Sequence, residues 1–387
     1  MKRILLCIAA ILLLAVTTDA QGSGLVVLDY LRLPKDSAEK IQLVEELGEF
    51  LLLARQTEVE NPLVLPAEQA ETLLLLDEIR EMFSDDSLAT EAYLMGVEAL
   101  YDKKSYVVQV AYIAEQQGLP MLKACFDFVA HKVESGFLFS SPLKRNTCDW
   151  KTETNDYLTF YYQSDKAKTT VNQYVKYILE FDTKLNINRK TDFYLCDECE
   201  SMVQMLQLVG VRYKADYNGF AWNSISFTME DKVVTIESQR LSRRQVIDPH
   251  DLFHWRASLA IPEGKNHYMV CGAAYVYCGS WGISWEGIQQ LFKTRMVYDK
   301  NTDWLALYFE RYNFGESWEN HLLVTQFINA LVVQKVEKEQ GFSAVMELLR
   351  SGDMYTDRAK FFDVLERVAG INGANFNQKV SELVAGL

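Results

Sequence analysis

The chain has 387 residues, and its 39 Lys and Arg against 53 Asp and Glu give a formal net charge of −14. This acidic balance disfavours nucleic acid as a partner, because a phosphate-binding patch would have to overcome the field of the whole protein. An apolar content of 49% with only 7 prolines excludes a disordered or collagen-like chain. The length predicts about two domains.

Residues 1–20 have the pattern of a signal peptide. Lys2 and Arg3 precede the apolar run Ile4–Val16, and positions 18 and 20 carry the small residues that a signal peptidase requires. Cleavage is expected before Gln21, which predicts an exported protein in the periplasm or outside the cell. No later stretch approaches 18 uninterrupted apolar residues, so we expect no transmembrane segment in the mature chain.

Residues 21–145 are predicted to form a small N-terminal α+β domain. Asp36 is a suitable N-cap for a helix whose apolar residues recur on one face as far as Leu52, and a second helix is expected over Ala67–Met82. The pattern then becomes strand-like, with strands predicted at 106–113, 122–133 and 137–140. Helices followed by an antiparallel meander indicate an α+β domain, and no catalytic cluster is evident in it.

Residues 146–387 are predicted to form a second, mainly helical domain with a small sheet. The apolar pattern is interrupted near residues 141–150, which suggests a domain boundary there. Beyond it the pattern predicts strand, long helix, strand, helix and two strands, at 157–163, 171–185, 191–195, 200–209 and within 220–237. After Pro249 the chain is expected to be mainly helical, so the fold class of the whole chain is α+β.

Histidine is scarce, and three of the five histidines, His250, His254 and His267, fall within eighteen residues. Pro249 can begin a helix, since its missing N–H would have no partner in the first turn. His250 and His254, four residues apart, then project from one face of that helix. Such a pair presents two nitrogen ligands to one zinc ion, and an acidic residue after the first histidine, here Asp251, can act on the metal-bound water.

The segment His250–His254 (HDLFH) resembles the HExxH helix of zinc metallopeptidases, and Cys271–Tyr275 (CGAAY) resembles the EGxA helix that supplies the third ligand in gluzincins. The order of predicted elements before these motifs is similar to that of the peptidase-MA-like group of exported bacterial proteins. The likeness covers the chain from about Thr147 to the C-terminus. It implies a zincin-like fold and peptide-bond hydrolysis by a water molecule that Zn²⁺ activates.

Under this resemblance, His250, His254 and Cys271 are the metal ligands and Asp251 is the catalytic base. Two of these residues depart from the family pattern, since Asp251 stands in place of Glu and Cys271 in place of the ligand Glu. Asp is one methylene shorter, which withdraws its carboxylate by about 1.5 Å, and a misplacement near 1 Å can cost about 100-fold in rate. A His, His, Cys set is chemically suitable for zinc. These departures predict a degenerate site, with hydrolysis only if the site has stayed active, and the alternative is a non-catalytic secreted or periplasmic binding protein that keeps the zincin scaffold.

Arg256, Tyr275 and Trp281 are predicted to line the pocket for a peptide or protein ligand, since they follow or flank the two motifs. Arg256 has an alternative role, which is to hold a structural carboxylate. His267 has two as well, as a substitute metal ligand or as a loop histidine.

Six cysteines remain after leader removal, and in an exported protein they permit disulfides. Cys196 and Cys199 form a CxxC motif that is redox-active, metal-binding or a local disulfide. Cys271 and Cys278 would be separated by about 10 Å on one helix, too far for a bridge to each other. A four-cysteine zinc site from both pairs is a further alternative. The remaining two are Cys125 and Cys148.

Overall fold

The computed structural model describes residues 24–56, 60–84, 89–102, 104–196, 199–215, 224–238, 248–299, 301–315 and 321–387. The predicted signal peptide lies outside this part of the chain. The described residues contain both helices and sheets, with sheets toward the N-terminus and mostly helices toward the C-terminus, so the predicted α+β class is confirmed. No helix among the described residues is both long and apolar enough to cross a membrane.

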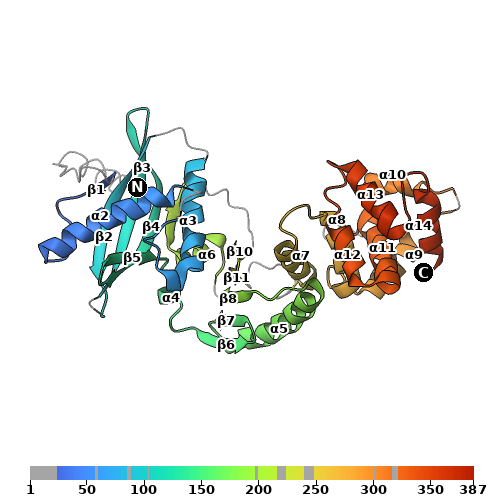
Figure 1. The fold of residues 1–387 in the computed structure, drawn as a ribbon, viewed down its shortest axis with the longest axis horizontal. Coiled ribbons are helices and arrows are strands. Elements are labelled where there is room, and N and C mark those ends of the chain that lie inside the picture. The colour runs from blue at the N-terminus through green and yellow to red at the C-terminus, as the bar shows by residue number, and fades with distance from the viewer. Residues whose placement is uncertain are drawn as a thin grey trace. The chain divides into compact units, whose positions relative to one another are not determined.

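The chain divides into two compact units (Figure 1). The first contains the described residues within 1–167 and 189–241, and the second those within 168–188 and 242–387. The predicted boundary between residues 145 and 146 does not coincide with this division. The reason is that the strands after residue 146 belong to the first unit, whereas the second unit is helical.

The first sheet is an antiparallel meander, β2 to β5, with two added strands, β1 and β9. Its order is β1-β2-β3-β4-β5, and β9 pairs with β4 beside this path. Strands β3, β4 and β5 form the predicted antiparallel meander. Strand β2, which the sequence did not predict, extends it antiparallel to β3, whereas β1 runs parallel to β2. The strands are β1 (Leu25–Val27), β2 (Thr90–Ala99), β3 (Ser105–Gln116), β4 (Leu119–Val133), β5 (Gly136–Ser140) and β9 (Val211–Lys214).

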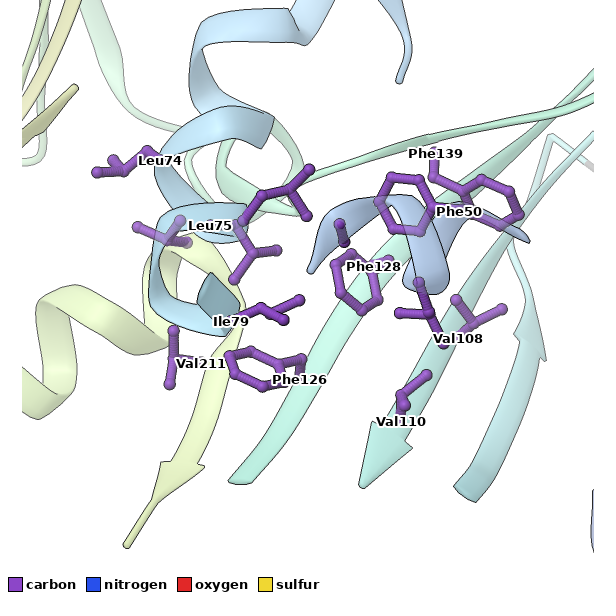
Figure 2. Close-up of a cluster of buried hydrophobic side chains, with 14 of the residues drawn as sticks. Phe50, Leu74, Leu75, Ile79, Val108, Val110, Phe126, Phe128, Phe139 and Val211 are labelled. Carbon is purple, nitrogen blue, oxygen red and sulfur yellow. The ribbon is translucent and has the colours of Figure 1, made fainter. Parts of the chain in front are cut away.

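Helices α2 (Ser37–Ala54) and α3 (Gln69–Ser84) cover this sheet (Figure 1). The Asp36 carboxylate accepts hydrogen bonds from the Ala38 and Glu39 amides, so the predicted N-cap of α2 is confirmed. Figure 2 shows Phe50 of α2 among the aromatic rings of the strands, and its ring stacks on that of Phe139 with 4.8 Å between centroids. This unit also contains η1 (Pro66–Glu68), α4 (Leu143–Asn146) and α6 (Met202–Val209).

The second sheet of the first unit has the order β10-β11-β8-β7-β6. Strands β7, β8 and β11 are parallel, and the outer strands β6 and β10 are antiparallel to their neighbours. At the end of β8, its last residue Cys196 forms a disulfide with Cys199, which is one of the three predicted alternatives. The strands are β6 (Lys151–Asn155), β7 (Leu158–Tyr162), β8 (Lys190–Cys196), β10 (Ser224–Thr228) and β11 (Lys232–Ser238).

The second unit is built around α11 (Val324–Gln340), which contacts α8, α10, α12, α13 and α14. Most residues of α11 are buried, as expected for a central helix. Helix α5 (Asp165–Leu185) begins in the first unit and continues in the second. The other helices are α7 (Pro249–Ala260), α8 (His267–Cys278), α9 (Trp285–Arg295), α10 (Trp304–Phe309), α12 (Phe342–Leu349), α13 (Arg358–Ala369) and α14 (Phe376–Ala385).

Candidate metal centre

Helix α7 begins as its sequence predicts. Asp248 is the N-cap, and its carboxylate accepts a hydrogen bond of 2.9 Å from the His250 amide, while Pro249 occupies the first helical turn. Four residues along, His254 lies above His250, and the two ring centroids are 5.0 Å apart. The predicted histidine pair therefore lies on one face of α7.

Helix α8 brings a cysteine to this pair. It is capped by Asn266, whose side-chain oxygen accepts from the Met269 amide, and it packs closely on α11. The close approach depends on Gly272, since a Cβ built there would lie 2.6 Å from the Asn329 Cβ. Because Gly272 adjoins Cys271, the packing of α8 on α11 also fixes the position of the Cys271 sulfur.

One ligand atom from each of His250, His254 and Cys271 lies within 4.8 Å of the other two, and among the described residues this is the group that could hold a metal ion. Three points no more than 4.8 Å apart lie within about 2.8 Å of a common centre, which is 4.8 Å divided by √3. Zinc bonds are about 2.0–2.1 Å to nitrogen and about 2.3 Å to sulfur. Inward movements of less than about 1 Å would thus complete the bonds, so these residues fit the ion.

The two imidazoles are in the chemical state that binds metals. His250 Nδ1 lies 3.0 Å from the Gly279 carbonyl oxygen at the end of α8, so Nδ1 carries the proton and Nε2 keeps its lone pair. Burial lowers the pKa of His250. Burial, followed by the charges of His250 and His267, holds the pKa of His254 well below 6.5. Both rings are therefore neutral at pH 7.

Cys271 is 3% exposed, and burial raises the pKa of its thiol to about 12. Without a cation the group is a thiol, and a bound metal would displace its proton. Gln326 of α11 hydrogen-bonds to this thiol and lowers its pKa, and Tyr275 donates to the Gln326 amide oxygen over 2.6 Å. Sequence patterns did not identify Gln326, because it comes from a distant helix with no motif around it.

Asp251 follows the first proposed ligand, His250, on α7. It is an exposed residue, yet the packed protein around its carboxylate, with the like charge of Asp248, raises its pKa to about 6. Its charge also raises the pKa of the Cys271 thiol, which puts the carboxylate within electrostatic reach of the sulfur. Among the described residues, no side chain forms an ion pair with Asp251. The carboxylate is therefore available as a base.

His267 adjoins the same group. It is the first residue of α8, and its Nε2 lies 3.7 Å from Cys271 Sγ. Its ring centroid is 4.9 Å from that of His254. His267 is thus a helix residue in contact with the sulfur, whereas the loop alternative is wrong.

The three predicted pocket residues have different environments. Arg256 is fully buried, and its Nε donates to Asp182 Oδ1 over 2.6 Å while its Nη2 contacts Oδ2. The predicted ligand role of Arg256 is therefore wrong, because its guanidinium holds a structural carboxylate. Tyr275 is also fully buried, and its ring packs against that of His250, with 5.6 Å between the ring centroids. Trp281 is 37% exposed, and its indole N–H donates to the His321 carbonyl.

Among the described residues, the cysteines do not form a second metal site. Cys196 and Cys199 are bonded to each other in the first unit, so the four-cysteine zinc alternative is wrong. Cys271 and Cys278 lie on one helix and are not bridged to each other, as their spacing predicts, and both are free. The Cys278 thiol donates to the Ala274 carbonyl, one turn earlier on α8, over 3.1 Å.

No protein-family model matches this chain, and no curated protein sequence matches it.

Proposed function

We propose that this protein is an exported zinc hydrolase of gluzincin descent that cleaves peptide bonds. The observation that carries the proposal is the convergence of His250, His254 and Cys271 within 4.8 Å. The succession β7, α5, β8, α6, β9, β10, β11, α7, α8 supports it, since strand, long helix, strand, helix and strands before the two motif helices is the order on which the resemblance rests.

Each residue has a defined role under this proposal. His250, His254 and Cys271 would hold Zn²⁺, which would supply a Lewis acid and a water whose pKa is lowered to about 7. Asp251 accepts a proton from water as it attacks the peptide carbonyl, and a pKa of about 6 leaves its carboxylate ionised at neutral pH. The Gly279 carbonyl accepts from Nδ1 of His250, which leaves Nε2 as the nitrogen that would bind the ion.

Metal analysis tests the carrying observation. Protein expressed without residues 1–20 is dialysed against zinc at buffered nanomolar free concentration, and bound metal is measured by mass spectrometry. We expect one zinc per native chain and less than a tenth of that in His254→Ala. His131→Gln, which removes a histidine from the first unit, is the matched control and should bind as the native chain does. A native chain that binds no zinc contradicts the proposal.

Peptide hydrolysis tests the base. With a library of internally quenched peptides, Asp251→Asn should lower kcat/KM by about 10²-fold or more, the usual effect of losing a general base. Asp251→Glu, which restores the length found in the family, should keep activity. Glu263→Gln changes an exposed carboxylate just beyond α7 and serves as the control. If Asp251→Asn cleaves as fast as the native chain, Asp251 is not the base.

A second candidate function is a zinc-containing binding protein without hydrolysis. The shorter Asp251 and the buried thiol favour it, because thiolate ligands are typical of structural zinc sites. In this case the native chain retains zinc and binds peptides but does not cleave them. Asp251→Asn would then leave peptide affinity unchanged, as isothermal titration would show.

Export is part of the proposal, and the Cys196–Cys199 disulfide supports it, since disulfides persist mainly in oxidising compartments. Expressed with its first 20 residues in a bacterial host, the protein should be recovered from the periplasm or medium. Its N-terminal residue, read by mass spectrometry, should be Gln21. Retention of Met1 would contradict this part.

A further inference from the structure

Two hydrogen-bonding side chains contact the Cys271 sulfur in addition to the proposed metal ligands. His267 lies one helical turn before Cys271 on α8, with its Nε2 at 3.7 Å from Sγ. Gln326 of α11 is held by a hydrogen bond of 2.6 Å from Tyr275, one helical turn beyond Cys271, and its side chain lowers the pKa of the same thiol. The sulfur is therefore contacted from its own helix and from the helix that packs against it.

The orientation of Gln326 follows from its other contact. The Tyr275 hydroxyl donates to the Gln326 amide oxygen over 2.6 Å, so the amide NH₂ group is the part left to face the sulfur. Tyr275 is fully buried, which restricts the rotation of its own side chain and of the Gln326 amide bonded to it. For His267, the tautomer with its proton on Nε2 is the one that can donate to sulfur.

Donors of this kind are what a buried thiolate needs. A charged sulfur that is only 3% exposed loses nearly all its hydration, and such a loss is costly unless hydrogen bonds replace it. Hydrogen bonds to a metal ligand also fix its position, and their removal typically costs 10–100-fold in metal affinity.

We propose that His267 and Gln326 are positioning residues whose N–H groups hold Cys271 as the sulfur ligand of the metal. This inference rests on the proposed function, since it requires that Cys271 bind the metal. It assigns the two side chains to the sulfur and leaves His250 and His254 as the nitrogen ligands.

Cobalt(II) is the probe, because it replaces zinc and its sulfur-to-cobalt charge-transfer band reports on the thiolate. A hydrogen bond stabilises the sulfur lone pairs, so losing one moves the band to longer wavelength. We expect His267→Ala and Gln326→Met each to shift the band in this direction and to weaken cobalt binding 10–100-fold. His267→Gln restores an N–H donor and should recover most of both effects. His131→Gln is the control without a change.

Every outcome is decisive. If the native chain binds no cobalt, or if Cys271→Ser keeps the charge-transfer band, the proposed metal site itself fails. If the native chain binds cobalt but neither variant moves the band or the affinity, the positioning roles are wrong while the site stands. A change of d–d bands in His267→Ala that indicates a lost nitrogen ligand makes His267 a ligand and overturns its role as a donor. Circular dichroism confirms the fold of each variant.

Discussion

Replacing Arg256 with methionine should destabilise the helical unit by about 3–5 kcal/mol, the usual cost of leaving one member of a buried ion pair alone. Arg256 on α7 and Asp182 on α5 are 0% and 1% exposed, and two guanidinium nitrogens contact the two carboxylate oxygens. The Arg256 guanidinium also lies 4.8 Å from the Trp255 ring centroid. Without Arg256, the Asp182 charge would remain in a site that water does not reach.

Hydrogen–deuterium exchange in increasing urea, followed by mass spectrometry of peptides from α5 and α7, measures this loss for the helical unit alone. The double variant Arg256→Met with Asp182→Leu should recover much of the stability, because no unpaired charge is left. Lys335→Met removes an exposed pair with Glu339 and should cost less than about 1 kcal/mol. A cost below about 1 kcal/mol for Arg256→Met, with lost peptide binding, would refute the structural role and favour the ligand role.

Three further predictions concern packing, the disulfide and pH. Gly272→Ala should lower the free energy of unfolding by about 1–3 kcal/mol, because the new Cβ forces α8 away from α11. Gly373→Ala is the control: no atom lies within 4 Å of its new Cβ, so the variant should melt at the native temperature in calorimetry. Cys196→Ser should destabilise the first unit by about 2 kcal/mol, which is the loop-entropy value for a short loop. Tryptic mapping of the native chain without reductant should find Cys196 linked to Cys199. Burial lowers the pKa of His131, so as pH falls the imidazole is protonated in the unfolded chain before it is protonated in the folded one. The free energy of unfolding should therefore decrease below about pH 6.5 in urea titrations. In His131→Gln this decrease should be smaller. An NMR pKa for His131 at or above 6.5 would contradict the last expectation.

Local signals in the sequence were sufficient for much of the fold and for the core of the candidate site. Asp36 and Pro249 each mark a helix start, because capping depends on residues only two or three positions away. The spacing of His250 and His254 fixes their common face by helix geometry alone.

Other features depend on contacts between distant parts of the chain. Arg256 meets Asp182 across 74 residues, and no local pattern distinguishes this pairing from a ligand-binding arginine. Gln326 lies 51 residues from Tyr275, with which it bonds. Strand β9 has only four residues and is recognisable as a strand chiefly through its pairing with β4.

The first unit is built from two separate stretches of the chain, within 1–167 and 189–241, and this affects how it can fold during synthesis. Strand β8 is an inner strand of the second sheet only when β11 lies beside it. Strand β11 ends at Ser238, so it is synthesised well after β8 and after α5. While the nascent polypeptide is shorter than this, β8 leaves the ribosome with an unpaired edge, which is open to wrong partners. The N-terminal half therefore cannot mature in simple order of synthesis, and a chaperone that shields strand edges should raise the yield of correctly folded protein.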